Sequence, residues 1–150
     1  MSNDWIGLPE NLNEFHSVVY LVECTIPNEY RYYVGVKQVL KRCKLKPLKD
    51  GKKRKAVYKD NGLLSYYGSS NKLLADIEKN GVENYSRKVL HLCKSKSEAK
   101  YLEACEQFIR NVLFDDRSYN EIVNLRIGRF KKGFTLSFDD LYQKIKSSSV

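Results

Sequence analysis

Two β-prone segments separated by a short turn constrain the fold of this chain more than any other feature. Residues 17–24, SVVYLVEC, form an apolar run rich in β-branched side chains, which is typical of a buried strand. Six residues later, residues 31–36, RYYVGV, have the same character. Because the connection is so short and contains Pro27 and Asn28, an antiparallel hairpin is the simplest arrangement.

The rest of the chain alternates helical and extended patterns. Helices are predicted over residues 72–79 and 97–113, each after capping residues, with a third strand at about 87–93 between them. Residues 37–44 and 138–146 could form short helices, and residues 119–125 a loop or short strand. Strands that join directly, with the helices later, predict an α+β fold: a small three-stranded, mostly antiparallel sheet flanked by helices.

The length of 150 residues fits one core rather than two. We therefore expect an N-terminal arm at 1–16, one domain at 17–125 with a basic insertion at about 37–63, and a tail at 126–150. No run approaches the roughly 20 apolar residues that span a membrane. The N-terminus lacks the pattern of a secretory signal. The cysteines have no metal-binding spacing and are expected to be reduced thiols, so we expect a cytoplasmic protein; they are Cys24, Cys43, Cys93 and Cys105.

The net charge of +9 indicates a polyanionic partner, of which nucleic acid is the commonest. It is concentrated in residues 41–55, with nine basic side chains and one acid, Asp50. This segment is either a solvated loop or a surface on which phosphates separate the mutually repelling cations. We expect DNA contacts from Lys37, Lys41, Lys52, Lys53, Arg54, Lys55 and Lys72.

Several short motifs occur in a definite order along the chain. Val18-Val19-Tyr20 and Tyr33-Val34-Gly35 stand on the two predicted strands with twelve residues between the tyrosines. Tyr67-Gly68-Ser69, Lys72, the run NGVENY at 80–85 and finally Tyr119-Asn120 follow. Together, over residues 17–125, they resemble the GIY-YIG nucleases of phages and mobile elements, although Val18 stands where that family has glycine.

The resemblance implies an endonuclease of phage, mobile-element or restriction type that hydrolyses DNA phosphodiesters with Mg²⁺ or Mn²⁺. Tyr20 by preference would orient or deprotonate the attacking water, with Tyr33 beside it. The family's arginine follows its second tyrosine by about ten residues, which implies Arg42, or Arg54 if the basic segment is an insertion. Asn120 would brace the site or cap a turn.

The second predicted helix offers an argument that does not depend on the resemblance. Leu102, Glu106, Ile109 and Leu113 form one row along it, so Glu106 falls on the apolar face. A carboxylate there is costly unless it is paired. The partner could be a metal ion, as the resemblance implies, or an internal cation. Glu103 lies on a more polar row, and the resemblance favours Glu106 as the metal ligand.

Two alternative functions also fit this composition, and neither involves cleavage of DNA. One is a catalytically inactive nucleic-acid-binding protein of the same fold, which would show salt-sensitive binding without cleavage. The other is a basic structural protein in which the tyrosines simply pack the core, and this alternative leaves Glu106 without a role.

Overall fold

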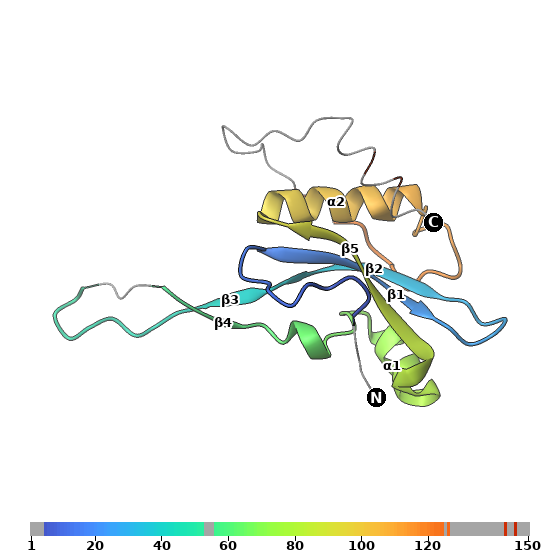
Figure 1. Cartoon of the computed structure of the whole chain (residues 1–150), viewed down its shortest axis with the longest axis horizontal. Helices are drawn as coiled ribbons and strands as arrows, with labels where there is room; N and C mark the ends of the chain where they lie inside the picture. The colour runs from blue at the N-terminus through green and yellow to red at the C-terminus, as the bar shows by residue number, and fades with distance from the viewer. Residues whose placement is uncertain (1–4, 53–55, 125, 127–142, 144–145, 147–150) are drawn as a thin grey trace.

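The computed structural model describes residues 5–52, 56–124, 126, 143 and 146. Its central sheet has three antiparallel strands in the order β2-β1-β5. β1 spans Ser17–Cys24, β2 Tyr32–Gln38 and β5 Tyr85–Cys93. α1 (Asn71–Asn80) and α2 (Lys96–Ile109) complete the α+β fold that the sequence predicts. Figure 1 shows α1 and α2 on opposite sides of the sheet.

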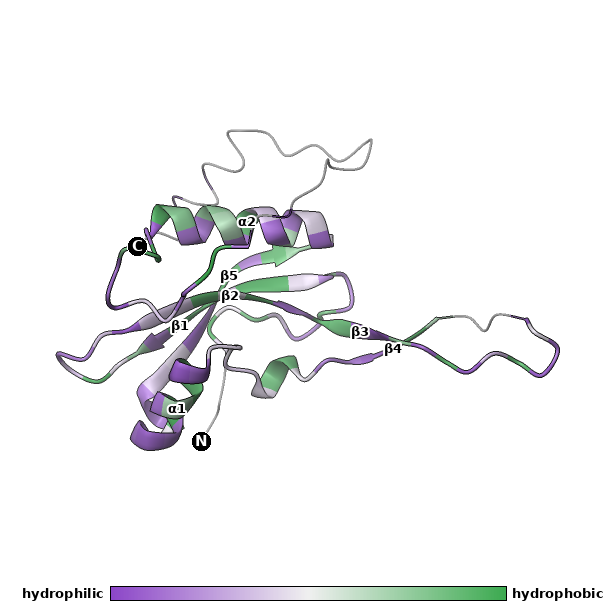
Figure 2. Ribbon diagram, turned by 180° about the vertical axis from the view of Figure 1, so that it is seen from behind, coloured by the Kyte–Doolittle hydropathy of each residue, from purple (hydrophilic) through white to green (hydrophobic). Residues whose placement is uncertain are grey.

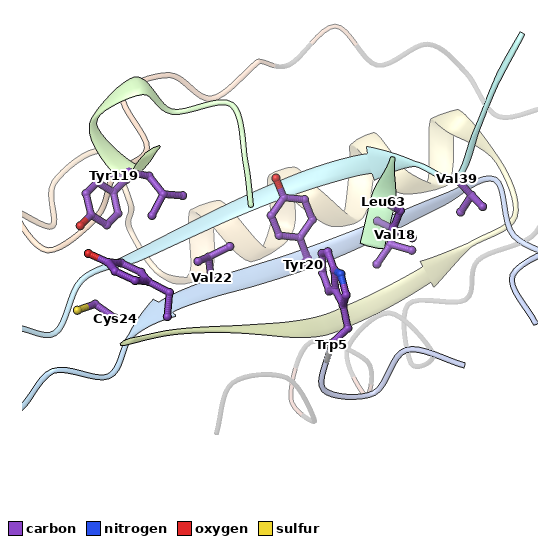
Figure 3. Close-up of a cluster of buried hydrophobic side chains, with 10 residues drawn as sticks. Trp5, Val18, Tyr20, Val22, Cys24, Val39, Leu63 and Tyr119 are labelled. Atoms are coloured by element: carbon purple, nitrogen blue, oxygen red, sulfur yellow. The ribbon is translucent and has the colours of Figure 1, made fainter. Parts of the chain in front are cut away.

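The two faces of β1 bury different partners because successive side chains alternate across a strand. Val19 packs toward α2 against Leu102 and Ala99. Tyr20 faces the other way, into a core cluster that includes Leu73 of α1. Trp5 meets the Tyr20 ring edge-on in this cluster, so the expected N-terminal arm packs against the sheet (Figure 3).

The segment after β2 forms strands and not the short helix predicted at residues 37–44. β3 (Leu40–Cys43) pairs antiparallel with β4 (Val57–Asp60) in a separate two-stranded sheet. This hairpin projects away from the central sheet (Figures 1 and 2). A short-range pattern could not reveal it, because β3 is extended by pairing with residues fourteen or more positions further along.

Smaller differences occur at the element ends. Short 3₁₀ turns, η1 (Leu63–Ser65) and η2 (Val82–Asn84), flank α1. α2 ends at Ile109 and not at 113, because the chain turns at Asn111, whose φ is 53°. The predicted helix at 138–146 lies outside the described residues except for two positions. The four cysteines, all of them described, form no disulfide. Within the described part of the chain, no helix is long and apolar enough to cross a membrane.

Candidate active site

Tyr20 and Tyr33 meet over Gly35 on the face of the sheet opposite α2. Tyr20 of β1 pairs with Gly35 of β2, and the ring centroids of the two tyrosines are 6.2 Å apart. A Cβ on Gly35 would lie 2.6 Å from the Tyr20 hydroxyl oxygen and 2.7 Å from Tyr33 Cε1. The glycine of the Tyr-Val-Gly motif is therefore required by the close approach of both rings.

We expect Gly35→Ala to destabilise the chain by about 1–3 kcal/mol, because the new methyl group overlaps two rings that are held by packing. The measurement is urea unfolding of both chains. Tyr20→Phe in the Gly35→Ala background should recover part of the loss, since it removes the nearer obstacle. A Gly35→Ala chain as stable as the parent would contradict the steric role of this glycine.

The two tyrosines differ in their access to solvent. Tyr20 is 1% exposed, whereas Tyr33 is half-buried and its hydroxyl lies 3.0 Å from Ser69 Oγ. Burial raises the pKa of Tyr20 well above its ordinary value, and burial also raises that of Tyr33. Both hydroxyls are therefore protonated at neutral pH. Tyr33 is the one placed to contact a substrate or water.

A pocket of about 490 Å³ opens beside Tyr33 at the outer edge of β2. Its lining includes Glu103 and Gln107 of α2, Asn120 from the segment after α2, and residues at the beginning of α1 and just before it, namely Ser69, Ser70, Asn71 and Lys72. These elements lie on opposite sides of the sheet, α2 on one and α1 on the other (Figure 1). The pocket therefore gathers polar groups from widely separated parts of the sequence.

Asn120 and Gln107 hold the β2 edge in place. The Asn120 side chain accepts from Val34 N at 2.9 Å and donates to Val34 O at 2.8 Å. Gln107 Nε2 donates to the same carbonyl at 3.2 Å. Of the two roles expected for Asn120, these contacts are those of a brace.

Two carboxylates line this pocket: Glu121, which is paired with Lys72, and Glu103 of α2. Gln107 Nε2 donates to Glu103 Oε1 at 3.4 Å, and the negative charge of Glu103 contributes to the raised pKa of both Tyr20 and Tyr33. Burial raises the pKa of Glu103 to about 7, against the smaller opposing effects of Lys100 and Gln107. A proton or a cation therefore stabilises this carboxylate near neutral pH.

Glu106 lies elsewhere, and the expectation that it joins the tyrosines is revised. Its side chain is fully buried between α2 and β5, where Glu106 Oε1 lies 2.6 Å from His91 Nε2. Arg110, one helical turn later, pairs with the other carboxylate oxygen. His91 pairs with Val19 in the sheet and so faces α2, away from Tyr20. Internal cationic and imidazole partners thus account for the carboxylate on the apolar face.

One of three comparisons with known proteins gives a match. The family model described as "Putative endonuclease segE, GIY-YIG domain" matches residues 5–124. The chain belongs to this GIY-YIG family. Neither the curated proteins nor the solved structures give a match. The family membership indicates nuclease activity, and the GIY-YIG match includes Trp5, which the sequence assigned to a separate arm.

Among the described residues, no arginine lines the pocket. Arg42 stands on β3 opposite Tyr58 and is exposed on the projecting hairpin. Arg54 lies outside the described residues. The cation that lines the pocket, among the described residues, is Lys72, whose Nζ lies 2.5 Å from Glu121. Lys37 approaches the tyrosines from β2, with Nζ 4.0 Å from the Tyr66 ring centroid.

The remaining expected DNA contacts divide into two groups. Lys41 and Lys52 are exposed on the projecting hairpin. Lys53 and Lys55, like Arg54, lie outside the described residues. Sequence reasoning missed Ser69 and Gln107 as pocket residues and set Glu103 aside. The Tyr67-Gly68-Ser69 motif carried a signal for Ser69, since Gly68 also packs closely on the Tyr33 ring.

The pocket's donor set fits the divalent ion that the GIY-YIG resemblance implies. Within the described residues no three His, Cys, Asp or Glu side chains cluster as a closed metal cage. The polar pocket instead offers Glu103, which forms no ion pair with another described residue, and Glu121, which is paired with Lys72. Mg²⁺ is commonly bound through one or two carboxylates, with waters and substrate phosphate completing its coordination.

Proposed function

We propose that this chain is a metal-dependent DNA endonuclease that uses Glu103, not Glu106, to hold Mg²⁺ or Mn²⁺. The observation that carries the proposal is the shared pocket of Glu103, Tyr33 and Asn120, built over the Tyr20–Gly35 contact. A phage, mobile-element or restriction nuclease of the cytoplasm would fit the family membership. The bound ion would supply Lewis-acid activation and charge neutralisation at the scissile phosphate.

The tyrosines would act as protonated groups that orient water. Tyr33 is the better placed, since its hydroxyl borders the pocket while Tyr20 is buried beneath it. Because burial raises the pKa of Tyr33, its hydroxyl would donate or accept a hydrogen bond before it gave up a proton. Tyr20 supports this ring from below, and the Tyr66 ring in turn meets Tyr20 edge-on, with 6.1 Å between their centroids. This exchanges the roles that the sequence suggested for the two tyrosines.

A lysine would take the place of the family's arginine. Lys72 lines the pocket at the beginning of α1, and its partner Glu121 is equally exposed, so their ion pair is easily exchanged for a phosphate. A lysine contributes a point charge where an arginine would bind two phosphate oxygens at once. Lys37 of β2 adds a second positive charge on the pocket side of the sheet.

The test incubates the pure chain with supercoiled plasmid and Mg²⁺ or Mn²⁺, with and without EDTA. Nicked or linear products that require the metal ion support the proposal. Cleavage that persists in EDTA contradicts the metal dependence. Salt-sensitive binding without cleavage would favour the inactive DNA-binding alternative, for which the lack of an arginine in the described pocket is the specific observation.

The pKa of Glu103 predicts a pH-dependent stability effect. Folding raises this pKa from 4.5 to about 7, so the protonated form is favoured in the folded chain. Its contribution to stability is fully present below pH 4.5 and is lost as the pH rises through 7. In EDTA, Glu103→Gln should therefore exceed the parent in stability by about 1–3 kcal/mol at pH 8, and by far less at pH 5.

Thermal unfolding of both chains at pH 5 and pH 8 measures this effect. Tyr33→Phe, which leaves the carboxylate in place, should keep the parent's pH dependence and serves as the control. A stability difference between Glu103→Gln and the parent that is the same at both pH values would contradict the raised pKa.

A further inference from the structure

The hairpin of β3 and β4, with the described residues that connect these strands, forms a ribbon with mostly exposed side chains. We call the described residues of this hairpin, 40–52 and 56–60, the β-ribbon. From Lys41 to Asp60 every described residue is exposed except the half-buried Cys43. Figures 1 and 2 show the ribbon extending away from the sheet and from both helices. An isolated two-stranded hairpin is only marginally stable in water, so this exposure calls for a partner.

The register of the ribbon places like charges opposite one another. Lys41 pairs directly with Lys59, and side chains of paired residues lie on the same face of a hairpin. Directly opposed like charges destabilise a strand pair unless counterions lie between them. The next pair, Arg42 with Tyr58, lies on the other face. Both faces of the ribbon therefore carry cations suited to phosphate.

The connecting segment extends this charge. Its described lysines are all exposed, namely Lys44, Lys46, Lys49 and Lys52, and the acid among them is Asp50. Tyr58 is the exposed aromatic side chain among the described ribbon residues. Proteins that bind single strands usually stack bases on several aromatic rings, whereas a cationic ribbon fits the phosphate-walled major groove of a duplex. The ribbon's composition favours the duplex.

The ribbon also has a fixed relation to the candidate active site. β3 begins two residues after β2 ends, and β2 carries Tyr33, Gly35 and Lys37 toward the pocket side of the sheet. We propose that the β-ribbon enters a groove of duplex DNA beside the cleavage site and extends the protein's footprint to one side of the cut. The position of the cut rests on the proposed function; the binding by the ribbon does not.

The first test measures duplex binding without cleavage, in a Glu103→Gln background and without divalent ions. Lys41→Gln and Lys59→Gln should each lower the slope of log affinity against log salt by about 0.9, the value for one lost phosphate contact. Lys79→Gln, an exposed one-charge change on α1, is the matched control and should leave the slope unchanged. Thermal unfolding verifies that each variant is folded.

A slope for the ribbon variants equal to that of Lys79→Gln would overturn the proposal. The proposal would also be overturned if the ribbon variants lost as much affinity for a single strand of the same sequence as for the duplex, because the duplex affinity should fall more. This test needs no cleavage. If the parent chain fails to cut DNA but the ribbon lysines still determine duplex binding, the nuclease proposal falls and the ribbon proposal stands.

The second test removes the ribbon. Leu40 and Asp60 are directly paired, so an Asn-Gly turn can replace residues 41–59 between them. Relative to the mapped cut of the parent chain, the footprint of the shortened chain should lose several base pairs on one side. Symmetric shortening, or an unchanged footprint, would contradict the placement. If Mg²⁺ raises the unfolding temperature of the shortened chain as much as that of the parent chain, the pocket is intact.

Discussion

Glu103→Gln should reduce the cleavage rate by at least about 100-fold, more than the 10–100-fold typical of residues that only support a metal ligand. The amide keeps the shape of the side chain but cannot offer a charged oxygen to a cation. It should also abolish the rise in unfolding temperature that Mg²⁺ produces in the parent chain. Plasmid cleavage and thermal unfolding with and without Mg²⁺ measure the two effects.

Glu106→Gln is the matched control, because it makes the same chemical change one turn later on the same helix. Its chain should still respond to Mg²⁺, since Glu106 faces His91 on the other side of the sheet. The reverse result, in which Glu106→Gln loses the metal response and Glu103→Gln keeps it, would return the metal to Glu106. Comparing the metal-induced shift avoids confusing lost binding with lost stability.

Glu106→Ala should have the largest effect on stability, about 3–5 kcal/mol, because breaking a buried ion pair leaves its partners without compensation. His91 and Arg110 would lose the carboxylate that both contact, in a position with no exposure to solvent. Urea unfolding, extrapolated linearly to water, measures the change.

A double variant separates the ion pair from the space it fills. His91→Leu with Glu106→Leu replaces both buried polar groups by apolar ones, and Arg110, at the end of α2, can turn toward solvent. Such replacements are often neutral, so this chain should recover much of the stability lost in Glu106→Ala. If the double variant is no more stable than Glu106→Ala, packing and not the buried charge dominates at this position.

The central elements could be predicted because their signals are local. β1 has the predicted bounds, and α1 and β5 differ from prediction by only one or two residues at their ends. A β-branched run, a serine N-cap and a glycine at a helix end each act within a few residues. The β-ribbon was not predicted because β3 depends on pairing with β4. The sequence of β3 itself has no alternation of polar and apolar residues that would indicate a strand.

The choice between two glutamates shows the limit of reasoning from a helical pattern. The spacing placed Glu106 on the apolar face correctly, and the alternative of an internal cation accounts for it. The pattern could not show that α2 lies near the edge of the sheet, where Glu103 at the border of its apolar face reaches the pocket beside β2. A site at the edge of a sheet can therefore include residues that, in the sequence, appear only as part of an amphipathic helix.

The braces on β2 have a consequence for how this chain behaves among its own copies. β2 is an outer strand, and an outer strand with open N–H and C=O groups can pair with another molecule. Here Tyr32 N and O bond to Arg117 O and Tyr119 N, and Asn120 occupies both polar groups of Val34. The contacts that position the pocket thus also occupy the outward polar groups of Tyr32 and Val34, and they oppose intermolecular β-pairing along this part of the edge.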